Sequence, residues 1–124
     1  MSARRRRASR GPSWAQVRRG FLALPGVSEG TSYGTPAFRV GRKLLARLRE
    51  DGENLVLCVS FEERETLLAA APEVFHVTDH YAGYPAVLVR LARVEAADLP
   101  RLAELAWRGA APRRAVAKWE AARR

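Results

Sequence analysis

Apolar and polar residues alternate in two short runs on either side of Gly41-Arg42. Alternation with a period of two across a glycine-containing turn predicts a β-hairpin, which we place at residues 34–49. Its inner face is expected to carry Phe38, Val40, Leu44, Ala46 and Leu48. Its outer face is expected to carry Leu45 together with basic residues and no acid, namely Arg39, Arg42, Lys43, Arg47 and Arg49. The pattern therefore predicts a basic ribbon on one side of the fold.

Outside the hairpin, the same patterns predict four helices and three further strands. Helices are expected to begin near Ser13, Ser60, Asp98 and Pro112. Strands are expected at residues 55–59, 74–77 and 86–91, and residues 27–36 are interpreted as turns. The element order α-β-β-β-α-β-β-α-α predicts an α+β fold, with an antiparallel sheet of about five strands and helices packed mainly on one face.

Four large apolar residues from separate elements are expected to meet in the core. They are Phe21, Phe38, Leu57 and Trp107, and each lies on the apolar face of its own element. Burial of such side chains is the main favourable term in folding. This cluster therefore predicts which face of the hairpin points inward.

Charge is unevenly distributed along the 124 residues, whose formal net charge is +9. Residues 1–12 carry five arginines and no acid, and residues 112–124 carry five basic residues against Glu120. Of the 22 basic and 13 acidic residues, 12 of each remain in the middle, which is therefore neutral. We expect a disordered basic arm at 1–12 and one domain at 13–124 with a basic C-terminal helix.

Several function classes find no support in the sequence. No catalytic motif, phosphate-binding loop or catalytic Cys/His pair is present, so we expect no enzyme and no catalytic residue. The single Cys58 in an apolar strand excludes an internal disulfide, and His76, Asp79 and His80 lack a metal-site spacing, so no metal or cofactor is expected. No apolar run could span a membrane and no signal peptide is recognised, so a cytoplasmic protein is expected.

Four segments resemble the MmcQ/YjbR family: LALPGV at 22–27, GTPAFRVGRK at 34–43, HYAGYPAVLVRL at 80–91 and WRGAAPRR at 107–114. The resemblance covers roughly residues 14–119 and rests on glycine, proline and aromatic positions. It implies a frataxin-like (CyaY-like) fold with a double wing of β-hairpins, and it implies DNA binding. Because the first helix carries Arg18 and Arg19 and no acid, frataxin-like iron binding is not expected.

Two functions fit the residues. The first is a small non-enzymatic nucleic-acid-binding protein that contacts the phosphates of DNA or RNA through Arg39, Arg42, Lys43, Arg47, Arg113 and Arg114. The second is a protein- or small-ligand-binding module whose sheet face carries His80, Tyr81 and Tyr84. The acid-free hairpin favours the first function and the neutral middle favours the second. The oligomeric state stays open.

Overall fold

The computed structural model of the chain describes residues 11–123. Its helices are α2 (Trp14–Leu22), α3 (Phe61–Ala70), α4 (Leu99–Ala110) and α5 (Arg113–Ala122), with short 3₁₀ turns η1 (Asp79–Tyr81) and η2 (Ala96–Asp98). Its strands are β1 (Val27–Ser32), β2 (Thr35–Val40), β3 (Lys43–Leu48), β4 (Asn54–Cys58), β5 (Phe75–His76) and β6 (Ala86–Arg90). All but the last two residues of the predicted basic arm at 1–12 lie outside the described part.

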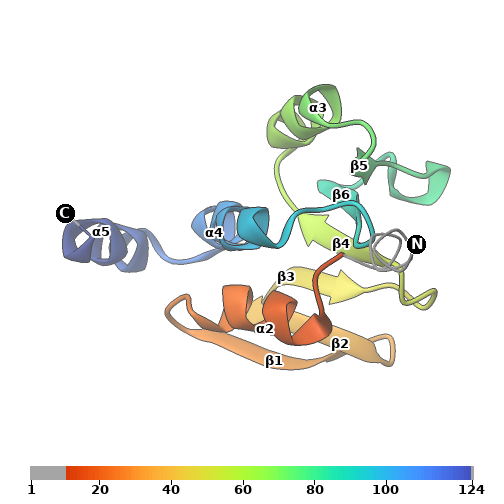
Figure 1. Ribbon diagram of the computed structural model, residues 1–124. Coiled ribbons are helices and arrows are strands. Elements are labelled where there is room, and N and C mark those ends of the chain that lie inside the picture. Colours follow the sequence, from red (N-terminus) through yellow and green to blue (C-terminus); the bar gives the residue numbers. More distant parts are fainter. Residues whose placement is uncertain (1–10, 124) are drawn as a thin grey trace.

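The six strands form one antiparallel sheet in the order β1-β2-β3-β4-β6-β5 (Figure 1). The α+β class and the antiparallel sheet were expected, but the structure has one strand more than the predicted five. The additional strand is β1, which the sequence pattern assigned to turns. Four of its six residues are exposed and its sequence VSEGTS has no apolar alternation, because β1 is an edge strand held mainly by pairing with β2.

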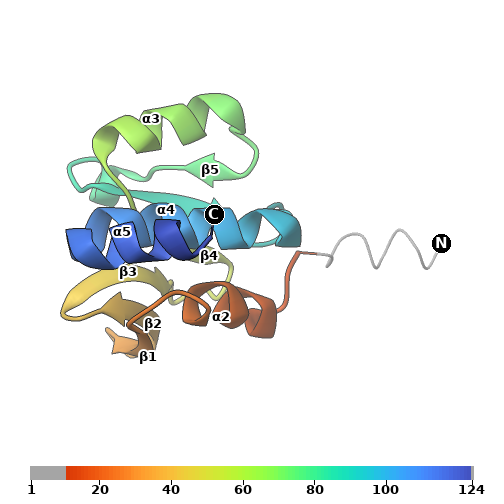
Figure 2. The same ribbon diagram turned by 90° about the vertical axis from the view of Figure 1, so that its left-hand side faces the viewer.

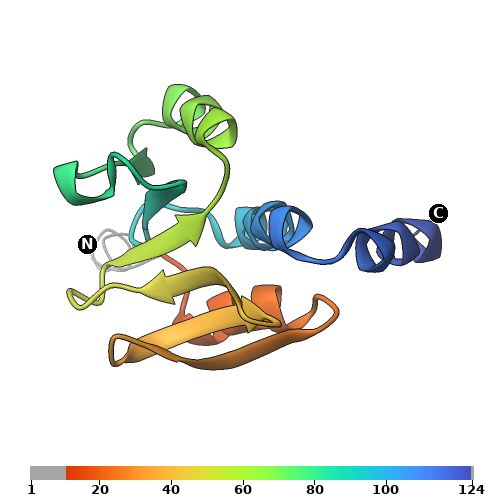
Figure 3. The same ribbon diagram turned by 180° about the vertical axis from the view of Figure 1, so that it is seen from behind.

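The helices cover one face of the sheet in two layers (Figure 2). Helices α2 and α4 pack against each other and against the strands, and α5 lies beyond α4, on the side away from the sheet (Figure 1). Arg108 pairs with Glu120, Arg123 approaches Glu104 at 3.9 Å, and the Trp119 ring contacts Trp107, so α4 and α5 form an antiparallel helix pair. Seen from behind, no helix within residues 11–123 lies across β2 and β3 on the other face of the sheet (Figure 3).

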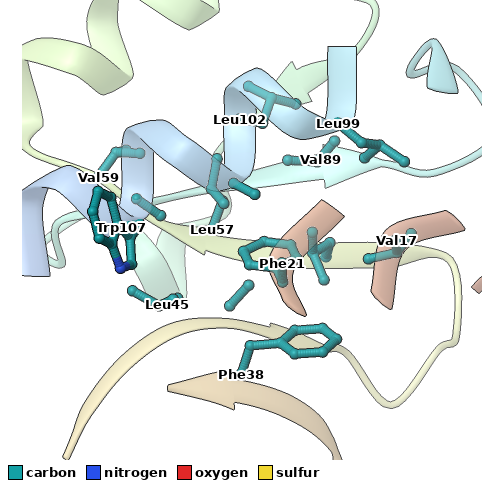
Figure 4. Close-up of a cluster of buried hydrophobic side chains, with 14 of the residues drawn as sticks. Val17, Phe21, Phe38, Leu45, Leu57, Val59, Val89, Leu99, Leu102 and Trp107 are labelled. Atoms are coloured by element: carbon teal, nitrogen blue, oxygen red, sulfur yellow. The ribbon is translucent and has the colours of Figure 1, made fainter. Parts of the chain in front are cut away.

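The core lies between this sheet and the inner helices, and the predicted cluster of four residues is confirmed (Figure 4). Phe21, Phe38, Leu57 and Trp107 are each at most 1% exposed. The Phe21 and Phe38 rings stack at 4.7 Å between centroids and 2° between planes. The Trp107 indole Nε1 donates to the carbonyl of Pro25 at 2.9 Å, which ties α4 to the connection between α2 and β1.

A β-bulge in the predicted hairpin changes which side chains reach the core. Phe38 pairs with Ala46, but the next residue Arg39 pairs with Leu44, so Leu45 is the extra residue on β3. Leu45 and Ala46 are both fully buried in the core cluster, whereas Leu44 is only partly buried. Strict alternation had placed Leu45 outward and Leu44 inward, and both of these assignments are wrong. Strict alternation fails across a bulge, because the bulge shifts the register by one residue and so changes the face on which the following side chains lie.

Candidate functional site

The basic residues of the hairpin do not form one exposed surface. Arg42 and Lys43 are exposed at the β2–β3 turn, whereas Arg39 is partly buried and donates to the carbonyl of Thr31 at 3.1 Å. Arg47 is only 8% exposed, so the prediction that it lies free on the outer face is wrong. The alternation did place Arg47 on the face opposite the helices, but neighbouring side chains cover it there.

Arg47 is held by contacts from several elements. Its Nη1 donates to Thr35 Oγ1 at 3.2 Å and to the carbonyl of Leu48 at 3.3 Å, and its Nη2 donates to the Tyr81 hydroxyl at 3.2 Å. The carboxylate of Glu50, which is 63% exposed, lies 3.5 Å from Nη1. Burial alone would lower the pKa of Arg47, but the interactions with Tyr81 and Glu50 more than offset it and the pKa is raised. The guanidinium is therefore charged.

This charge lies in a large cleft of about 1000 Å³. Strand β3 pairs with β4 only along Ala46–Leu48, so the first residues of β3 diverge from the end of β4 (Figure 3), and Lys43, Leu44 and Cys58 from these two ends line the cleft. Its walls come from the sheet face that the helices leave open, the β1–β2 turn, the start of α3, the segment before β6 and the end of α4. The cleft is lined by polar and aromatic residues, among them Tyr33, Lys43, Arg47, Glu50, Glu63, His80, Tyr81 and Tyr84, together with apolar residues such as Val56 and Leu105.

The three aromatic residues predicted for a ligand site do come together. His80 and Tyr81 meet edge to face at 4.8 Å between ring centroids, and Tyr84 lies 6.0 Å from His80 and 6.2 Å from Tyr81. Tyr81 is partly buried with Val56 and Leu88 on the open face of the sheet, whereas Tyr84 is 57% exposed. The structure thus places these three residues in the same cleft as Arg47, which the sequence had assigned to the predicted nucleic-acid-binding surface.

Arg64 holds in place the segment that carries His80, Tyr81 and Tyr84, and the sequence did not lead us to Arg64. This residue of α3 is 9% exposed, and its guanidinium donates to the carbonyls of Tyr81, Ala82, Tyr84 and Ala86 at 3.0–3.4 Å. One signal was available: Arg64 precedes Leu67 and Leu68 by three and four residues and so occupies the inward stripe of the helix. A positively charged side chain at such a position indicates that hydrogen-bond acceptors lie opposite it in the interior.

Tyr33 is the second residue that sequence reasoning missed. Its ring lies over the Arg47 guanidinium, 5.2 Å from the central carbon, while the residue as a whole is 85% exposed. It belongs to the β1–β2 turn, which was not predicted as a hairpin because β1 was not recognised.

The predicted α5 residues lie apart from this cleft. Arg113 and Arg114 are exposed in the first turn of α5, which has no acidic residue, and neither lines the cleft. They follow Ala110, which closes the cleft at the end of α4. The nucleic-acid contacts predicted from sequence therefore divide into an exposed set, the partly buried Arg39 and the buried Arg47.

Other polar residues near the sheet have local partners. His76 Nε2 lies 2.9 Å from Asn54 Oδ1, and burial followed by the charges of Arg90 and Arg49 lowers the pKa of His76. Burial raises the pKa of the Cys58 thiol to about 11, so this cleft residue is a neutral thiol at pH 7. Within residues 11–123, no three His, Cys, Asp or Glu side chains gather as a metal site, and no helix is long and apolar enough to cross a membrane.

The sequence model of the YjbR family matches residues 22–109. The chain belongs to the YjbR family. It is similar to the uncharacterized proteins Rv2570 of Mycobacterium tuberculosis and Mb2600 of Mycobacterium bovis, each 36% identical over 122 residues, with 84% of this chain and 92% of the relative covered. Among solved structures, the Deinococcus radiodurans protein DR2400, with a DUF419 domain, has a TM-score of 0.64 at 24% identity and covers 81% of this chain and 79% of its own. That likeness shows the fold.

The span of the YjbR match separates the two groups of candidate residues. It contains every residue that lines the cleft except Ala110, and it ends before Arg113 and Arg114. The cleft is thus built from the part of the chain that the YjbR model describes, whereas the basic residues of α5 lie beyond it.

Proposed function

We propose that this YjbR protein is a non-enzymatic binding module whose cleft takes a small organic anion. The observation that carries the proposal is the charged, nine-tenths buried Arg47 in a cleft walled by tyrosines and aliphatic side chains. Ligand sites are commonly concave and mostly apolar, with a few placed polar groups that orient the ligand. The location of the cleft on the open sheet face is consistent with such a site.

The chemistry of Arg47 favours an anion. Its nearest carboxylate, Glu50, is 3.5 Å away and largely exposed, so water screens that pair. A guanidinium presents donors in a planar fork that matches a carboxylate or phosphate, and hydrogen bonds between charged groups are the stronger ones. The Tyr81 hydroxyl, already bonded to Arg47, can donate its own proton to the same anion. Lys43 adds a second positive charge to the lining, which also contains the carboxylates of Glu50 and Glu63, the latter bonded to the backbone N–H of Ser60.

Binding of 2-naphthoate, an anion with an apolar body, is expected to weaken about 10- to 100-fold when Arg47 is replaced by methionine, because a charged hydrogen-bond donor is lost. The measurement is a titration followed by the backbone amide signals of ¹⁵N-labelled protein. Arg39→Met is the matched control, since Arg39 lies on the neighbouring strand and does not line the cleft. Equal binding by both variants, or equal binding of the uncharged 2-naphthamide by the parent, would contradict the proposal.

Nucleic-acid binding is a second candidate function, and the exposed cations favour it. Arg42 and Lys43 are exposed at the β2–β3 turn, and Arg113, Arg114 and Lys118 are exposed on α5. We propose phosphate contacts with DNA through these residues, without Arg47. The double-wing, CyaY-like description and a cytoplasmic location stay predictions from the sequence.

Reversing the charges of Arg42 and Lys43 to glutamate is expected to flatten the plot of log affinity against log salt by about 2 units for duplex DNA, because two phosphate contacts are lost. Fluorescence anisotropy with a labelled duplex and a labelled single strand at several salt concentrations measures the slope. The control is Arg93→Glu with Arg101→Glu, which makes the same charge change at two other exposed residues. If both double variants have the same slope, the turn does not contact the phosphates.

A further inference from the structure

The backbone at Tyr33 adopts a conformation that its side chain disfavours. Tyr33 and Gly34 are the two central residues of the β1–β2 turn, and both have positive φ, 54° and 81°. Two-residue hairpin turns of this kind favour Asn, Asp or Gly at both positions, because a bulky side chain is strained at positive φ. Within residues 11–123, every other residue with positive φ is a glycine.

This unusual conformation of Tyr33 affects the cleft, because the Tyr33 ring lies at its edge. The Tyr33 ring lies over Arg47 and lines the cleft, yet the residue is 85% exposed. One side of the ring therefore covers the buried cation, and the rest is open to the solvent at the edge of the cleft. Tyr81 and Tyr84 line the same cleft. Aromatic walls next to a cation suit a ligand that is both planar and anionic.

We propose that Tyr33 determines the specificity of the cleft by stacking on the planar group of an aromatic or heteroaromatic anion whose charge is bound by Arg47. The inference rests on the proposed function and narrows its ligand from a small organic anion to a planar one. Strained backbone that persists in a folded protein is found preferentially at ligand sites. With its left-handed backbone conformation, Tyr33 places its ring at the edge of the cleft, where the ring can stack on a bound planar group.

Replacing Tyr33 with asparagine distinguishes two roles of the ring, stacking on a ligand and a purely structural role over Arg47. Asn suits the left-handed conformation but has no ring, so Tyr33→Asn is expected to raise the melting temperature by a few degrees and to weaken 2-naphthoate binding at least tenfold. Tyr33→Phe keeps the ring and is expected to bind like the parent. Leu22→Asn changes an exposed apolar residue outside the cleft and serves as the control.

A second ligand tests planarity directly. Decahydro-2-naphthoate has the same charge and nearly the same size as 2-naphthoate, but its saturated rings cannot stack. The parent protein is expected to prefer 2-naphthoate, and Tyr33→Asn is expected to lose that preference. Affinities are measured by the same amide titration, and melting temperatures by circular dichroism.

The outcomes distinguish this inference from the function on which it rests. If the parent binds both anions equally and Tyr33→Asn binds them as the parent does, the cleft is an anion site and the stacking role of Tyr33 is wrong. A lower melting temperature with unchanged binding in Tyr33→Asn would assign Tyr33 a purely structural role over Arg47. If the parent binds neither anion, the proposed function fails and the inference fails with it.

Discussion

Replacing Phe38 with alanine is expected to lower the free energy of unfolding by about 3 to 5 kcal/mol. Phe38 is fully buried on β2, and its ring stacks on Phe21 at 4.7 Å and on Trp14 at 5.7 Å. Removing it leaves a cavity between the sheet and α2 that these two rings, held by their own helix, can fill only in part. Urea denaturation followed by far-ultraviolet circular dichroism measures the change.

Phe61→Ala is the matched control for this substitution. Phe61 is 47% exposed at the start of α3, so the same truncation there is expected to cost about 1 kcal/mol or less. If Phe38→Ala and Phe61→Ala unfold at the same urea concentration, the inner face of the β2–β3 hairpin is assigned incorrectly. The assignment of Ala46 to the buried side of β3 would then also be wrong, because Ala46 pairs with Phe38.

Arg64→Met is expected to lower the free energy of unfolding by about 3 kcal/mol, because buried carbonyls lose charged donors. The Arg64 guanidinium donates to four carbonyls between Tyr81 and Ala86. Methionine fills much of the same space but has no hydrogen-bond donor. Beyond the stability loss, the segment that carries His80, Tyr81 and Tyr84 is expected to become mobile. Binding of 2-naphthoate would then weaken, although Arg64 does not line the cleft.

Hydrogen exchange of the Tyr84 and Ala86 amides reads out this local effect, since both donate to carbonyls within the same segment. Faster exchange there than in β2 would show that Arg64 acts on the segment and not only on global stability. Arg101→Met is the control, because Arg101 has a side chain that is 82% exposed and pairs only with Asp98 among the described contacts. Unchanged exchange at Tyr84 and Ala86 in Arg64→Met would contradict the positioning role.

The candidate site was only partly predictable from the sequence. His80, Tyr81 and Tyr84 are close in sequence within one turn, so their meeting depends on local structure. Arg47 is hydrogen-bonded to Tyr81, which lies 34 residues further along the sequence. A pattern of neighbouring residues does not extend that far. The alternation placed Arg47 on the correct face of the sheet, but burial there depends on Tyr33 and Tyr81, which arrive from two other segments.

The amino-acid order alone determined the elements whose signals are local. Capping boxes at Ser13 and Ser60, apolar periodicity and glycine turns predicted four helices, the α+β class and the residues that meet in the core. Only the tertiary structure decided the rest. β1 exists because β2 supplies its hydrogen-bonding partners, the bulge at Leu45 is defined by the pairing of β3 with β2, and Arg64 is buried because four distant carbonyls face it. The Arg64 contacts join groups far apart in the chain, whereas β1 and the bulge depend on the pairing of two strands, which the polarity pattern of one strand does not contain.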